Sequence, residues 1–139
     1  MKLFRVIIII FLCALSFRFS AQNQKIESMR VAFINDKLKL TPQEAQVFWP
    51  IYNEYLDKMK AIRREKKKLY LQSDINSNET ADDFINKKVQ LEQTEMQYIK
   101  DYSIKFKKAI GNIKTALLFK SEEEFKQELL KVLKSDKND

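Results

Sequence analysis

The chain has very few of the residues that build turns and irregular backbone. Among its 139 residues there is one glycine, Gly111, and there are two prolines, Pro42 and Pro50. After the first 21 residues, β-branched residues are sparse and no segment shows the sustained apolar–polar alternation of a strand. Apolar residues recur instead at spacings of three and four. We therefore predict an all-α fold of about four helices, two of them long.

The first 21 residues have the pattern of a secretory signal peptide. Lys2 and Arg5 precede an apolar run over residues 6–15, and the small residues Ser20 and Ala21 follow it. The run is too short to span a bilayer as a stable anchor. We expect cleavage near Ala21, which would leave an exported protein with a single all-helical domain over residues 22–139 and a frayed tail after Lys134.

An uncleaved anchor or a lipoprotein is the alternative for this start. The only cysteine, Cys13, follows Phe11 and Leu12 and lacks the small neighbour that lipid attachment favours. Because cleavage would remove this cysteine, no disulfide could form in the exported protein. Its stability must then come from packing or from association with another chain.

The absence of histidine restricts the possible chemistry. Without histidine or an exported cysteine, the chain lacks the commonest zinc ligands and the usual general base. A carboxylate-based hydrolase stays open, but it needs a cleft built from turns that this sequence hardly offers. We predict a non-enzymatic protein with no cofactor and no metal.

The first half of the sequence is predicted to form two helices. Apolar spacing predicts a first helix over residues 24–38. Thr41, Pro42 and Glu44 together predict a capped start for a long second helix, with a bend near Trp49 caused by Pro50. Its apolar stripe has one polar member and consists of Phe48, Tyr52, Tyr55, Met59, Ile62, Lys66 and Leu69.

Residues 73–78 are dense in turn formers and predict an exposed loop between antiparallel helices. Thr80 and Asp83 form a second capping signature, and a wide apolar face follows. We expect a break at Gly111–Asn112 and then a final amphipathic helix. The expected apolar face has one line through Ile85, Val89, Met96, Ile99, Phe106 and Ile110 and a neighbouring line through Phe84, Leu91, Tyr98 and Tyr102.

Positive charge is concentrated in residues 58–68, where seven lysines and arginines are opposed by Glu65 alone. Such a cluster attracts acidic partners. Nucleic acid is rarely met by an exported protein, so we expect no nucleic-acid partner. An interfacial membrane helix and an ordinary solvated lysine-rich face are the other readings.

Two further clusters have a structural reading beside a functional one. Phe48, Trp49, Tyr52 and Tyr55 could form a binding platform, but clustered aromatic residues are also common core material, and core is the better explanation. The glutamates over residues 122–124 could bind calcium, yet consecutive helical positions point in different directions, which favours a solvated face.

The segment Leu40-Thr41-Pro42-Gln43-Glu44-Ala45-Gln46, opening a long basic helix, resembles the LTxxQ family of Spy/CpxP-like periplasmic proteins. The runs Phe48–Tyr52 and Glu122–Leu130 resemble a subgroup described as sensors of extracytoplasmic-function (ECF-type) sigma factors. In this sequence the motif residues are Leu40, Thr41 and Glu44, and Glu44 stands where the motif has glutamine. No second copy of the motif is recognisable near residues 113–117.

The resemblance implies a cradle or hairpin of long helices, often paired as a homodimer. It also implies an ATP-independent chaperone that holds unfolded or misfolded envelope proteins in the envelope stress response. The alternative is a signalling protein with one membrane-anchored partner, such as a sensor kinase or an anti-sigma factor. The family's metal-sensing members use histidines, so metal sensing is not carried over. Our candidates for client contact are Met59, Lys60, Ile62, Arg63, Arg64 and Lys67.

Overall fold

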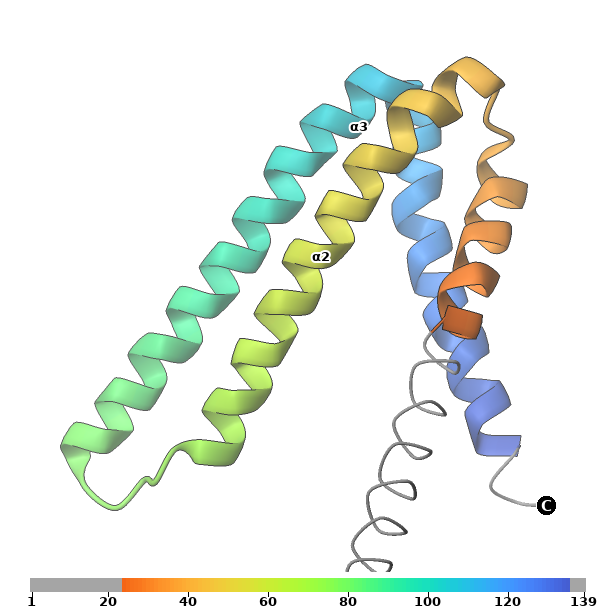
Figure 1. The fold of residues 1–139 in the computed structure, drawn as a ribbon. Coiled ribbons are helices and arrows are strands. Elements are labelled where there is room, and N and C mark those ends of the chain that lie inside the picture. The colour runs from red at the N-terminus through yellow and green to blue at the C-terminus, as the bar shows by residue number, and fades with distance from the viewer. Residues whose placement is uncertain (1–23, 136–139) are drawn as a thin grey trace, which may run out of the picture. The chain divides into compact units, whose positions relative to one another are not determined.

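The computed structural model describes residues 24–135, and these are almost entirely helical (Figure 1). A helix over residues 24–38 is followed by α2, Pro42–Gln72, and α3, Asn78–Ser135. The described residues contain no strand, so the predicted all-α class is confirmed. The expected signal peptide and its cleavage site lie outside the described residues.

The structure has three helices where we predicted about four, because α3, Asn78–Ser135, joins two helical stretches across a kink at the expected break. Gly111 is the one non-helical residue inside it, with φ 76° and ψ 170°. This conformation is open essentially to glycine alone. The predicted break at Gly111 is therefore present as a kink between two helical stretches of α3.

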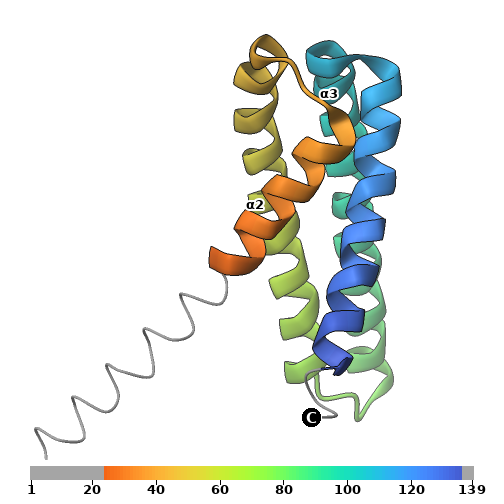
Figure 2. The same ribbon diagram turned by 90° about the vertical axis from the view of Figure 1, so that its right-hand side faces the viewer.

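Packing divides the described chain into two compact units. The hairpin unit is Leu40–Ala116, and the terminal unit is the described part of Met1–Lys39 and Leu117–Asp139. In the hairpin unit, α2 and the first part of α3 lie side by side in opposite directions (Figures 1 and 2). In the terminal unit, the helix over residues 24–38 lies against the last part of α3.

The hairpin unit is held by aromatic side chains from both helices. Phe106 of α3 is fully buried, and its ring centroid lies 5.7 Å from that of Phe48 and 5.6 Å from that of Tyr55. Tyr55 also lies 5.3 Å from Tyr102 by ring centroids. The aromatic cluster at Phe48 and Tyr52 is therefore core, as the sequence favoured.

The start of α2 follows the predicted capping box. Thr41 Oγ1 accepts a hydrogen bond from the Glu44 backbone N–H at 3.2 Å, and the Glu44 carboxylate accepts one from the Thr41 N–H at 2.8 Å. The helix continues through Pro50. In Figure 1 the first turns of α2 run at an angle to the rest of the helix, in agreement with the predicted bend near Trp49.

The start of α3 differs from the prediction. Ser77, and not Thr80, occupies the cap position: Ser77 Oγ accepts a hydrogen bond from the Thr80 N–H at 3.2 Å, and Thr80 Oγ1 accepts one from the Ser77 N–H at 3.1 Å. Thr80 thus fills the place of the glutamate in a capping box. The helix begins at Asn78, and the predicted loop is correspondingly one residue shorter.

The terminal unit has a small core of its own. The Phe33 and Phe125 ring centroids lie 5.6 Å apart, and the Lys37 ammonium pairs with the Glu124 carboxylate at 2.9 Å. The Arg30 guanidinium lies 5.3 Å from the centroid of the Phe125 ring, a cation–π contact. The buried apolar residues of this unit are Ile34, Leu38, Leu118 and Phe125.

Candidate functional site

The candidate site is the basic segment, residues 58–68 of α2. Lys60, Arg63, Arg64 and Lys67 follow one another at spacings of three, one and three, so they share one face of the helix. The apolar stripe of α2 occupies a different face, which packs in the hairpin. The basic residues therefore line a continuous strip along the hairpin unit.

Three residues of this strip have no ion-pair partner among the described residues: Arg63, Arg64 and Lys67, all of them exposed. Like charges at i, i+3 and i, i+4 destabilise a helix by roughly 0.2–0.5 kcal/mol per pair. The helix tolerates this repulsion among Arg63, Arg64 and Lys67. An arrangement of this kind is suited to holding an anionic partner.

Other cations of α2 and α3 contact carboxylates or an aromatic ring within the hairpin unit. Lys66, the polar member of the apolar stripe, forms an ion pair with Glu95 of α3. Lys105 pairs with Glu54 at 3.4 Å, and the Lys58 ammonium lies 5.9 Å from the centre of the Tyr98 ring. These lysines join the two helices, which separates them in role from the exposed strip.

Met59 and Ile62 do not belong to the site surface. Each is only 7% exposed, because it lies on the face of α2 that packs in the hairpin. Our expectation that these two residues contact a client is therefore not compatible with the closed hairpin. The expectation for Lys60, Arg63, Arg64 and Lys67 stays a prediction.

An exposed apolar residue that the sequence analysis missed lies on the basic strip. Leu71 is 73% exposed and stands four residues after Lys67, so it falls on the same helical face. The spacing of four from Lys67 was the signal that could have identified it. Leu71 gives the strip the apolar contact that Met59 and Ile62 cannot supply.

The apolar face of α3 also divides differently from the prediction. Tyr102, Phe106 and Ile110 are buried, whereas Ile85, Val89 and Met96 are 53%, 43% and 64% exposed. The wide face therefore turns only one of its edges toward α2. The other edge leaves an apolar stripe, Ile85–Val89–Met96, on the surface of the hairpin unit.

The family-motif residues lie at the start of α2 and act structurally. Leu40 is half-buried, Thr41 caps the helix, and Glu44 joins the cap to Lys114 of α3 through an ion pair of 2.6 Å. The ion pair with Lys114 and the hydrogen bonds from Thr41 lower the pKa of the Glu44 carboxyl below its ordinary value. They lie at the first turn of α2, whereas the basic strip lies over residues 60–67 of the same helix.

The glutamates over residues 122–124 do not gather into one cluster among the described residues. Glu124 pairs with Lys37, and Glu123 pairs with Lys126 at 3.5 Å. Burial raises the pKa of Glu122, although the charge of Arg30 opposes that shift. Within residues 24–135 no three acidic side chains gather closely enough to hold a metal ion.

Comparison with known proteins gave no relative. No protein-family model matches the chain. No curated protein and no solved structure matches it either. Among the described helices, none is both long enough and apolar enough to cross a membrane.

Proposed function

We propose that this chain is an exported, non-enzymatic protein that holds unfolded envelope proteins without ATP. The observation that carries the proposal is the exposed strip of Arg63, Arg64 and Lys67 with Leu71 at its end. A positively charged strip beside an exposed apolar residue is suited to bind a client protein that is both acidic and unfolded. The resemblance to Spy/CpxP-like periplasmic proteins and the signal-like start agree with this role.

The strip would act in two steps. Its unpaired positive charges raise the rate of encounter with acidic chains over a distance set by the ionic strength. Leu71 and its neighbours then supply a small apolar contact. Because so little area is buried, each complex would dissociate readily, and no nucleotide is needed to release the client.

We also propose that the protein works as a homodimer, joined through the Ile85–Val89–Met96 stripe. The support is that these residues are exposed along α3 although they repeat at helical spacing. Apolar stripes of this kind are commonly covered by a partner. Sedimentation velocity should show a dimer that Met96→Lys converts to a monomer; a monomeric parent protein would refute this.

The chaperone proposal is tested by light scattering. Two unrelated proteins, one unfolded by reduction and one by heat, are allowed to aggregate with and without this protein, at low and at high salt. Suppression of both, weakening as salt rises, is the expected result. Suppression of neither would favour the alternative, a regulator that binds a single membrane-anchored sensor or anti-sigma factor.

A further inference from the structure

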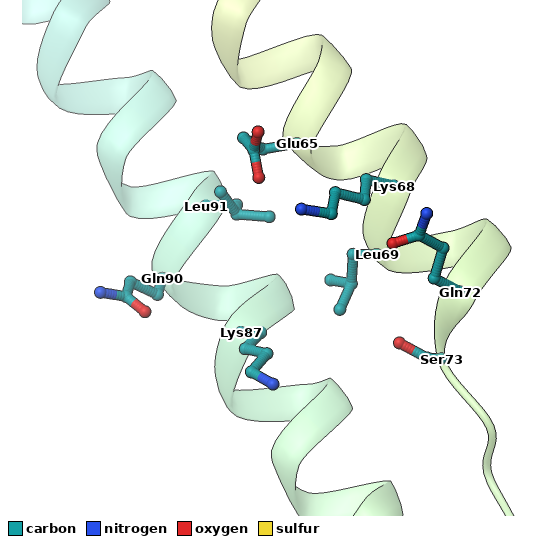
Figure 3. A pocket seen from close by; sticks show the side chains of 8 residues that line it. All are labelled: Glu65, Lys68, Leu69, Gln72, Ser73, Lys87, Gln90 and Leu91. Atoms are coloured by element: carbon teal, nitrogen blue, oxygen red, sulfur yellow. The ribbon is translucent and has the colours of Figure 1, made fainter.

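A cleft lies between α2 and α3 near the loop that joins them, outside the basic strip (Figure 3). We call it the distal cleft. Its volume is about 370 Å³, within the range of roughly 300–1,000 Å³ that is usual for ligand sites. Eight residues from the two helices and the end of α2 line it, which makes it a feature of the packed hairpin unit.

The floor of the distal cleft is apolar. Leu69 of α2 and Leu91 of α3 approach it from opposite sides (Figure 3), and both are half-buried. Each leucine therefore leaves part of its side chain uncovered by the hairpin. Such a surface favours an aliphatic chain, since covering it removes apolar area from water.

The rim of the distal cleft is positively charged. Lys68 of α2 and Lys87 of α3 both line it, and neither forms an ion pair with a described residue. Two nearby lysines differ from them, because Lys66 pairs with Glu95 and Lys88 pairs with Glu92. Two ammonium groups without an ion-pair partner among the described residues, one from each helix, thus flank one apolar floor.

The remaining lining groups limit the charge and shape of a ligand. Glu65 is the only acidic group on the rim, so the rim keeps one net positive charge. Gln72 and the Ser73 hydroxyl add neutral donors and acceptors at the end of α2. This composition suits an anion of one charge better than a phosphate of two, and a flexible apolar tail better than a sugar.

We infer that the distal cleft binds a carboxylate joined to an apolar chain, with Lys68 and Lys87 pairing with the carboxylate and Leu69 and Leu91 contacting the chain. Two sources carry this chemistry: a free fatty acid, and the C-terminus of a peptide that ends in apolar residues. The cleft is distinct from the basic strip, because Lys87 lies on α3 and Lys68, although within the basic segment 58–68, is not one of the four residues of the strip. It therefore stands or falls separately from the chaperone role.

The test is an NMR titration of the purified protein labelled at its leucine methyl groups. Decanoate is one probe, and an N-acetylated peptide ending in two leucines is the other. The expected result is saturable shifts of the Leu69 and Leu91 methyls with at least one probe, and the probe that binds identifies the source. No shift with either probe would overturn the inference.

Charge recognition is tested with matched probes and matched variants. Decanol and the amidated peptide keep the apolar groups and remove the carboxylate, and they should bind about tenfold more weakly. Lys68→Gln/Lys87→Gln should weaken the carboxylate probes by a similar factor, while Lys107→Gln/Lys108→Gln, which removes two exposed lysines elsewhere on α3, should not. Equal binding of charged and neutral probes, or equal losses in both variants, would overturn the inference.

Discussion

The Glu44 carboxylate completes the cap of α2 and at the same time pairs with the Lys114 ammonium, 70 positions further along the chain, at 2.6 Å. Lys114 lies three residues after the glycine that kinks α3. One side chain thus joins the first turn of α2 to the turn of α3 that follows the kink. A glutamine at this position could cap the helix but could not form the ion pair.

Substitutions at the cap should separate these two tasks. Thr41→Ala removes the capping hydroxyl together with the γ-methyl group and should lower the free energy of unfolding by about 1 kcal/mol. Glu44→Gln should destabilise less than Glu44→Ala, because the amide can still accept the hydrogen bond from the Thr41 N–H. Urea denaturation followed by circular dichroism measures all three; equal effects of the two Glu44 variants would contradict a capping role.

The Glu44 ion pair should also make stability depend on pH. Its folded pKa lies below the ordinary value of 4.5, so its contribution is fully present above pH 4.5 and is lost as the pH falls through the folded pKa. The difference in melting temperature between the parent protein and Glu44→Gln should therefore shrink from pH 7 to pH 3. A constant difference would show that the charge of Glu44 does not stabilise the fold.

Tyr102 should cause a second pH dependence, in alkali. Burial, with a hydrogen bond to Glu54, raises the pKa of Tyr102 to about 12 from 10.0. The neutral phenol is favoured in the folded state, so its contribution is fully present below pH 10 and is lost as the pH rises toward 12. Tyr102→Phe should be less sensitive than the parent protein over this window, as measured by melting temperature; an identical alkaline loss would contradict this.

Gly111 should not tolerate a side chain without cost. An added β-carbon would meet no atom within 4 Å, so the cost of Gly111→Ala comes from the backbone conformation alone. We expect a loss of about 1–3 kcal/mol in the free energy of unfolding. Asn112→Ala, at the next and exposed position, is the control and should change it by less than about 0.5 kcal/mol; a neutral Gly111→Ala would mean that the kink straightens freely.

Phe106 should be the residue on which the hairpin core depends most. It is fully buried and lies within 5.6–6.4 Å, by ring centroids, of four other aromatic rings. Phe106→Ala should cost about 3–5 kcal/mol, which could unfold the unit. Ile104→Ala removes a residue of the same helix that is 49% exposed and should cost less than about 1 kcal/mol; thermal denaturation compares the two.

Reversing the charge of the basic strip should slow client capture. Arg63→Glu/Arg64→Glu/Lys67→Glu should lower the association rate at low salt by about tenfold or more without reducing helix content, because these positions lie outside the packed face. Lys100→Glu/Lys107→Glu/Lys108→Glu makes the same change in net charge on exposed positions of α3. Stopped-flow binding to an acidic unfolded protein distinguishes them; unchanged capture in the first variant would refute the assignment.

The sequence alone determined the helical class, the helix over residues 24–38, the capped start of α2 and the loop before α3. Each depends on residues within a few positions of one another, as in the Thr41–Glu44 box, so local chemistry is sufficient. The start of α3 was misplaced because Ser77 and Thr80 are both competent caps. Local pattern does not decide between two equally good candidates three residues apart.

Only the tertiary structure decided which side chains remain on the surface. Met59 and Ile62 look like accessible members of a basic amphipathic segment, yet packing in the hairpin buries them. Ile85, Val89 and Met96 look like core, yet α2 covers only one edge of a face that is wider than a single partner helix. Burial and long-range pairs such as Glu44–Lys114 depend on which helices meet and at what register. Residues that are distant in the sequence determine this jointly.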